Sequence, residues 1–119
     1  MNINITVSGT ALTAPISEYV EKKLQSLIKL LDTKGDKEVL VRVELRKYSS
    51  QIKGEVFTVE VHLGNSGSLY DASATESDLY SAIDSVRDEL AREIKDAKGR
   101  RWDRMLEGGR SLKDMLKND

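Results

Sequence analysis

The sequence predicts an α+β domain with the element order β-α-β-β-β-α, in which two helices pack on one face of a four-stranded mixed sheet. Three observations support this fold class. Apolar residues alternate with a period of two in three segments, the last of which leads into a tight turn, they recur at helical spacing in two others, and the first helical segment lies between the first two strands. A helix in that position is a crossover connection, so the first two strands should be parallel.

The first strand is predicted at residues 2–8, where apolar and polar side chains alternate up to Gly9. Thr13 is a candidate N-cap for the helix that follows, and Pro15 suits its first turn. This helix should end near Asp32, before the polar cluster at residues 33–36. Its apolar positions share one face and are Ile16, Val20, Leu24, Leu27 and Leu31.

Three further strands are predicted in the middle of the chain. Alternation over residues 39–46 and 57–63 indicates two strands that each turn one polar face to water. Residues 64–67 have the composition of a tight turn. A fourth strand, at about residues 68–74, should therefore pair back on the third.

The second helix is predicted to begin after the fourth strand. Residues 75–78 match the capping-box pattern that starts at Thr75, and Ser77 is a competing N-cap. Gly99 is a candidate C-cap. We therefore predict a domain at residues 1–98 and a C-terminal tail at residues 99–119 that is partly helical or disordered. The apolar stripe of the helix consists of Leu79, Ile83, Val86, Leu90, Ile94 and Ala97.

The composition is that of a soluble, cytoplasmic protein with a single core. The chain has 119 residues, of which 39% are hydrophobic and 33% are charged, and it has no cysteine. These values predict a core that folds without disulfides, and no apolar run is long enough for a membrane span or a secretory signal. The formal net charge of -1 gives no basic surplus, so any RNA site must be local.

The residues that could carry catalysis do not form a recognisable set. His62 is the only histidine, and we interpret it as a surface residue with Glu60 nearby on the same strand face. Asp78 and Asp84 fall on different faces of the second helix. The chain has no phosphate-binding loop, zinc-protease motif or nucleophile elbow. We therefore expect a non-enzymatic protein without a metal ion, another cofactor or a small-molecule substrate.

The charges of the second helix separate by sign when they are placed at about 100° per residue. One flank of the apolar stripe carries Tyr80 and the basic residues Arg87, Lys95 and Lys98, although Asp84 and Asp88 dilute its charge. The other flank carries Glu89, Glu93 and Asp96, and Arg92 points outward. Two interpretations remain open: an ordinary solvated helix with weak surface pairs, which the charges alone favour, or a local RNA-binding surface.

Two segments resemble known proteins. Residues 69–84, with the core Asp78-Leu79-Tyr80-Ser81-Ala82-Ile83-Asp84, are similar to the strand-to-helix signature of bacterial ribosome hibernation-promoting factors and ribosome-associated inhibitors. Residues 13–24 resemble the first helix of that family, and residues 3–5 resemble its first strand. The likeness covers about residues 1–98, and its element order agrees with the one derived from periodicity.

The resemblance implies a fold like that of double-stranded-RNA-binding domains. It also implies a short-form factor that docks in the decoding region of the small ribosomal subunit, against rRNA and neighbouring ribosomal proteins, and blocks mRNA and tRNA binding. Members of the family silence idle ribosomes in stress and stationary phase. No membrane partner is implied.

The resemblance also suggests which residues contact RNA. Lys22, Lys23, Arg92, Lys95 and Lys98 match positions that are usually basic in the family. The candidate RNA-binding residues are Lys22, Lys23, Lys29, Arg87, Arg92, Lys95, Lys98, Arg100 and Arg101.

The chain departs from the family pattern at Glu89, Glu93 and Asp96, and Ser17 stands where an arginine is frequent. These departures support an alternative, a protein-interaction module that keeps the fold but binds rRNA weakly.

Overall fold

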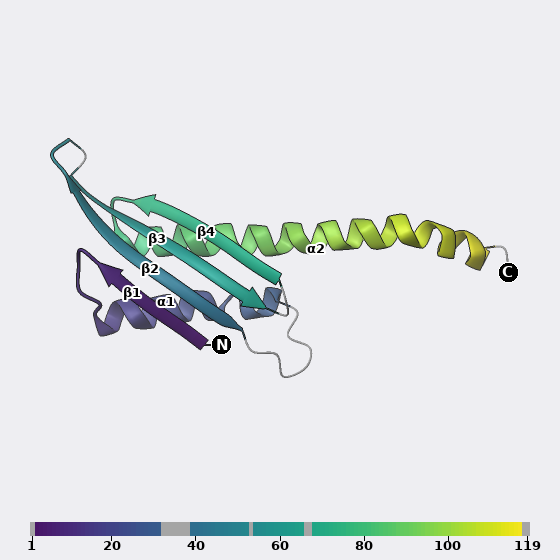
Figure 1. Cartoon of the computed structure of the whole chain (residues 1–119), viewed down its shortest axis with the longest axis horizontal. Coiled ribbons are helices and arrows are strands. Elements are labelled where there is room, and N and C mark those ends of the chain that lie inside the picture. Colours follow the sequence, from purple (N-terminus) through teal and green to yellow (C-terminus); the bar gives the residue numbers. More distant parts are fainter. Residues whose placement is uncertain (1, 32–38, 53, 66–67, 118–119) are drawn as a thin grey trace.

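The computed structural model describes residues 2–31, 39–52, 54–65 and 68–117, and for residues 101–117 it describes the helical backbone alone. Within these ranges the element order is the predicted β-α-β-β-β-α, with one short 3-10 helix added (Figure 1). The elements are β1 (Asn2–Ser8), α1 (Ala14–Gln25), η1 (Ile28–Leu30), β2 (Leu40–Ser50), β3 (Gly54–Asn65), β4 (Ser68–Glu76) and α2 (Leu79–Lys117).

The four strands form one mixed sheet in the order β1-β2-β3-β4. β1 is parallel to β2, with Ile5 opposite Val43, because the crossover through α1 returns the chain to the same end of the sheet. The pairs β2–β3 and β3–β4 are antiparallel. Both helices cover the same face, so the predicted fold class is confirmed (Figure 1).

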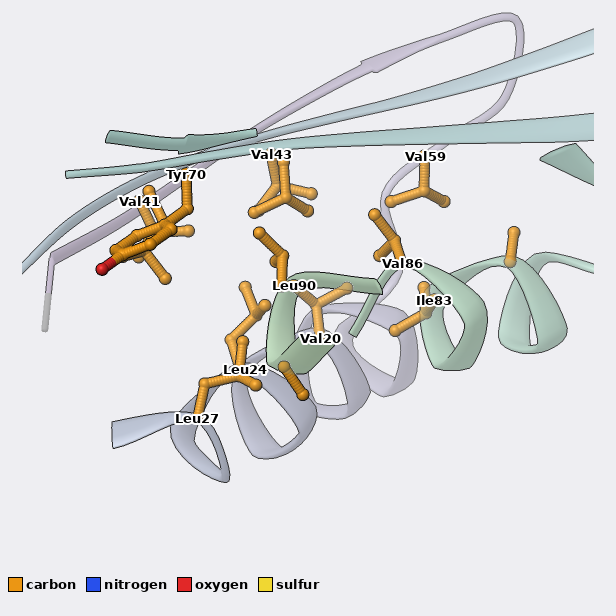
Figure 2. Close-up of a cluster of buried hydrophobic side chains, with 14 of the residues drawn as sticks. Val20, Leu24, Leu27, Val41, Val43, Val59, Tyr70, Ile83, Val86 and Leu90 are labelled. Atoms are coloured by element: carbon orange, nitrogen blue, oxygen red, sulfur yellow. The ribbon is translucent and has the colours of Figure 1, made fainter. Parts of the chain in front are cut away.

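The core lies between this sheet face and the two helices (Figure 2). From the sheet, alternate residues of the two central strands point inward and are almost completely buried: Val41, Val43, Leu45, Val59, Val61 and Leu63. From the helices, the buried side chains include Val20, Leu24, Ile83, Val86, Leu90 and Ile94. These are the positions that the two periodicities predict, and their burial is the main stabilising term available to a chain without cysteine.

The first helix ends earlier than predicted. α1 stops at Gln25 rather than near Asp32, because the hydroxyl of Ser26 donates a hydrogen bond to the Lys23 carbonyl and so competes with the helical pattern. The chain then tightens into η1, where the Leu30 N–H donates to the Leu27 carbonyl at 2.9 Å. Leu27 stays fully buried, so the apolar spacing is retained after the α-helix ends.

The predicted N-cap of the second helix is wrong. Thr75 belongs to β4, where its hydroxyl lies 2.8 Å from that of Thr58 on β3. Asp78 caps α2 instead: its carboxylate accepts hydrogen bonds from the Ser81 N–H at 2.9 Å and from the Ser81 hydroxyl at 3.1 Å. Thr75 and Glu76, which the capping-box pattern assigned to the start of the helix, are therefore the last residues of β4.

The predicted end of the second helix is also wrong. α2 passes through Gly99 without a break and continues to Lys117, so it extends beyond the sheet (Figure 1). A glycine C-cap needs a positive φ, and Gly99 is not among the positive-φ glycines of the described residues. A glycine inside a helix costs only about 1 kcal/mol, which a helix of 39 residues can tolerate. The division into a domain and a tail at this position stays a prediction.

Candidate nucleic-acid interface

The candidate RNA-binding residues lie on the helix layer, and the contacts between α1 and α2 set their surroundings. The rings of Tyr19 and Tyr80 meet edge to face, with centroids 4.9 Å apart and an interplanar angle of 79°. Further contacts join Tyr19 to Asp84 and Ser26 to Arg87. The flank of α2 that carries Tyr80, Asp84 and Arg87 therefore faces α1.

Tyr19, Lys23 and Asp84 form a polar cluster between the two helices. The Tyr19 hydroxyl donates to Asp84 Oδ1 at 2.6 Å, and Lys23 Nζ lies 3.2 Å from the same oxygen. The hydrogen bond from Tyr19 and the nearby Lys23 ammonium hold the pKa of Asp84 below its usual value. The same hydrogen bond raises the pKa of Tyr19, and the bond to Asp84 raises the pKa of Lys23. The charge of Lys23 is thus committed to an internal partner.

Arg87 and Arg92 are also paired within the protein. Arg87 Nε donates to the Ser26 hydroxyl at 2.8 Å, and its guanidinium lies 3.3 Å from Asp88. Arg92 pairs with Glu89 one turn earlier at 2.5 Å, and that hydrogen bond raises the pKa of Arg92. The Arg92 pair is exposed, so competition from another anion would require little desolvation.

The remaining basic side chains of the helix layer could bind an anion without giving up an ion pair among the described side chains. All of them are exposed, and among the described side chains none takes part in an ion pair: Lys22, Lys29, Lys95, Lys98 and Arg100. By helical spacing, Lys95 and Lys98 continue the flank of α2 that faces α1. Lys29 belongs to η1, which contacts α2. We call Lys29, Lys95 and Lys98 the free basic cluster. The side chain of Arg101 lies outside the described residues.

The acidic residues lie on the other flank of α2. Ser85, on that flank, donates to Glu76 of β4 at 3.1 Å, so this side of the helix faces the fourth strand. Glu89, Glu93 and Asp96 follow on the same flank by helical spacing. Among the described side chains, Glu93 has a buried carboxylate oxygen without a hydrogen-bond partner. Glu89, Glu93 and Asp96 therefore lie on a different flank of α2 from Lys95 and Lys98.

Two features, one in the site and one on the outer face of the sheet, do not follow from the sequence pattern. Asp84 has a definite structural role, because together with Tyr19 it orients Lys23. The available signal is spacing, since Tyr19 and Lys23 are one turn apart, as are Tyr80 and Asp84. The second feature is that His62 contacts Asp71, its cross-strand partner on β4.

The outer face of the sheet has its own charge network. Arg46 lies 2.6 Å from Glu44 and 2.9 Å from Glu60, and the hydrogen bond to Arg46 lowers the pKa of Glu44. On the same face, an open hollow of about 660 Å³ is lined by Arg42, His62 and residues of β1, β2, β3 and β4.

Within the described ranges, no group of three or more His, Asp or Glu side chains could hold a metal ion. No helix in those ranges is long and apolar enough to cross a membrane.

A mixed sheet with both helices on one face, and with exposed basic side chains on those helices, defines a small α+β domain whose helix layer carries the candidate RNA-binding residues. The chain belongs to the family described as Sigma 54 modulation protein / S30EA ribosomal protein, whose model matches residues 3–102. The family resemblance seen in the sequence is thereby confirmed.

Individual relatives support the same assignment. The chain is 31% identical over 94 residues to the ribosome hibernation promoting factor of Escherichia coli strain K12, and the match covers 79% of this chain and 90% of that protein. It is 33% identical over 98 residues to the ribosome hibernation promotion factor of Deinococcus radiodurans, and there the match spans 82% of this chain and 49% of the relative.

Solved structures share the fold. The N-terminal domain of Thermus thermophilus Protein Y superposes with a TM-score of 0.65 at 29% identity, covering 80% of this chain and 97% of that domain. A ribosomal subunit interface protein from Coxiella burnetii superposes with a TM-score of 0.66 at 19% identity, covering 83% of this chain and 99% of that protein. The second likeness concerns the fold alone.

Proposed function

We propose that this protein is a cytoplasmic ribosome hibernation factor that binds the small ribosomal subunit in its decoding region and blocks mRNA and tRNA. It acts as a stoichiometric plug and not as an enzyme. The observation that carries this proposal is the free basic cluster on a domain of this family. Residues 1–98 form the proposed ribosome-binding unit.

The chemistry of the helix layer suits a phosphate backbone. Lys22, Lys29, Lys95, Lys98 and Arg100 can meet phosphate oxygens without first breaking an ion pair among the described residues. Lys23 and Arg87 act as positioning residues, since their partners fix α1 against α2. Binding of this kind reads the shape and backbone of RNA, and it is sensitive to salt.

The test is co-sedimentation of the purified protein with small ribosomal subunits over a series of salt concentrations. We compare Lys95→Glu with Arg42→Glu, which makes the same charge change on the exposed outer face of the sheet. Lys95→Glu should weaken binding and lower the salt slope by about 1 for each phosphate that is no longer neutralised, whereas Arg42→Glu should bind like the wild type. Equal binding of both variants would contradict the proposed surface.

The distribution of charge on α2 also supports a second candidate, a protein-interaction module with weak rRNA affinity. The observation that favours it is the acidic flank beside Glu89 and Asp96, together with the net charge of -1. A pull-down from nuclease-treated lysate distinguishes the two functions. A partner that is retained without RNA, combined with no binding to small subunits at low salt, would favour this second candidate.

A further inference from the structure

β1 is an edge strand with an open hydrogen-bonding side. It pairs with β2 alone among the described strands. The Asn2 N–H donates to the Val39 carbonyl at 2.8 Å, so the backbone groups of Asn2 point toward β2. Backbone groups alternate in direction along a strand, and those of Ile3, Ile5 and Val7 therefore point to the open edge.

The sequence of β1 does not protect this edge. Folded sheets usually guard their edges with charged residues, proline, bulges or very short strands. β1 has seven residues, none of them charged or proline, and its register with β2 runs without a bulge from Asn2 opposite Leu40 to Ser8 opposite Arg46. The other edge strand, β4, carries Asp71 and Glu76.

The residues of β1 are symmetric about Ile5. If two copies of the strand run antiparallel with Ile5 opposite Ile5, then Ile3 faces Val7 and Asn4 faces Thr6 across the pair. Each position meets a residue of its own chemical class, and the Ile3–Val7 and Asn4–Thr6 contacts each occur twice, as in an interface with two-fold symmetry. In this register the residues with open backbone groups, Ile3, Ile5 and Val7, occupy the hydrogen-bonded pairs of the ladder.

We propose that a second copy of this chain binds along β1, so that one sheet continues through both copies. The partner strand would extend the apolar surface beside Ile3, Ile5 and Val7, which are only half-buried in one copy. The free basic cluster belongs to the helix layer and not to this edge, so the proposal is independent of ribosome binding. With only seven residues per strand the dimer is weak, because interfaces below about 1,200 Å² are typical of transient pairs.

The test uses two double variants at Asn4 and Thr6, whose side chains are exposed on the outer face. In the proposed register, position 4 of one copy faces position 6 of the other. Asn4→Lys with Thr6→Lys therefore places like charges opposite each other. Asn4→Glu with Thr6→Lys places opposite charges there, and within one copy it sets them beside Arg42 and Glu44, respectively, which are favourable neighbours.

Sedimentation equilibrium over a concentration series measures the association of the full chain. The wild type should dimerise reversibly, the variant with two lysines should have a dissociation constant about tenfold higher, and the variant with opposite charges should dimerise at least as well as the wild type. Hydrogen exchange at the Ile3, Ile5 and Val7 amides should slow as the concentration rises.

Three results would overturn the proposal: a wild type that stays monomeric at every concentration, two variants that associate equally, or amide protection that does not change with concentration. If the wild type stays monomeric, the alternative occupant of the β1 edge is an extended segment of another protein. Circular dichroism of both variants at low concentration checks that each one is folded, so a failure to fold is not mistaken for a loss of association.

Discussion

Tyr19 and Asp84 are 65 residues apart in the sequence, yet the Tyr19 hydroxyl donates a hydrogen bond of 2.6 Å to the Asp84 carboxylate. Lys23 reaches the same carboxylate, and its ammonium lies 5.4 Å from the centroid of the Tyr19 ring. One acidic side chain thus helps to join α1 to α2 and also holds a cation on the helix layer. The stability of the helix pair and the layout of the basic surface are therefore connected.

The pH dependence of stability should report on Asp84. Its pKa in the folded protein is below the unfolded value of 3.8, so its contribution is complete above pH 3.8 and is lost as the pH falls through the folded pKa. Asp84→Asn should therefore be less stable than the wild type at neutral pH, and the difference should shrink in acid. Urea unfolding of both proteins at neutral pH and below pH 3.8 measures this. A difference that stays constant with pH would contradict the prediction.

Release of Arg92 should strengthen binding to small ribosomal subunits. Glu89→Gln removes the partner of Arg92 and one negative charge from the helix layer, so binding at low salt should tighten by a few-fold. Glu55→Gln is the matched control, because it frees Lys47 from a 3.0 Å pair on the β2–β3 hairpin with the same charge change. Salt-dependent co-sedimentation compares the two variants. Equal tightening in both would indicate an effect of net charge and not of this surface.

Gly9 should be intolerant of substitution. Its φ is +79°, and a Cβ atom would lie 2.5 Å from the Lys47 carbonyl oxygen. Gly9→Ala should lower the free energy of unfolding by about 1–3 kcal/mol. The control is Gly99→Ala, where the space is open and α2 is continuous, and there we expect a gain of about 0.5–1 kcal/mol. Denaturant unfolding measures both, and a neutral Gly9→Ala would show that the turn relaxes.

Leu90 should be one of the most sensitive core positions. It is fully buried between α2 and the sheet (Figure 2), and Leu90→Ala should cost about 2–5 kcal/mol. Leu69 is 81% exposed, and Leu69→Ala should change stability by less than about 0.5 kcal/mol. Both values follow from denaturant unfolding. Similar losses at the two positions would mean that the apolar layer is not where the structure places it.

Periodicity is sufficient to predict the element order and the core. Spacing alone assigns Val43 and Leu90 to the interior, because a residue buried on a strand or helix repeats with the period of that element. The ends of the elements are less predictable. Ser26 and Thr75 each have a side chain that can stabilise two local structures, and tertiary pairing decides between them. Gly99 fails as a stop signal because one glycine inside a long helix costs only about 1 kcal/mol.

The candidate site is predictable only as a distribution of charge. Helical spacing places Lys95 and Lys98 on one flank and Glu89 on the other. The pairing of Lys23 with Asp84 depends on how α1 lies on α2, and local sequence does not contain that information. The cations that are committed internally and those that remain free can therefore be separated only once the two helices are positioned.

The parallel pairing of β1 with β2 also has a consequence for how the chain folds. The β2–β3 and β3–β4 pairs join neighbours in sequence, so little chain entropy is lost when they form. β1 must wait for α1 and for β2, because Ile5 pairs with Val43 across the whole crossover. During synthesis β1 is therefore the first strand of the sheet to emerge, and it stays unpaired, with its uncharged edge exposed, until α1 and β2 have followed it.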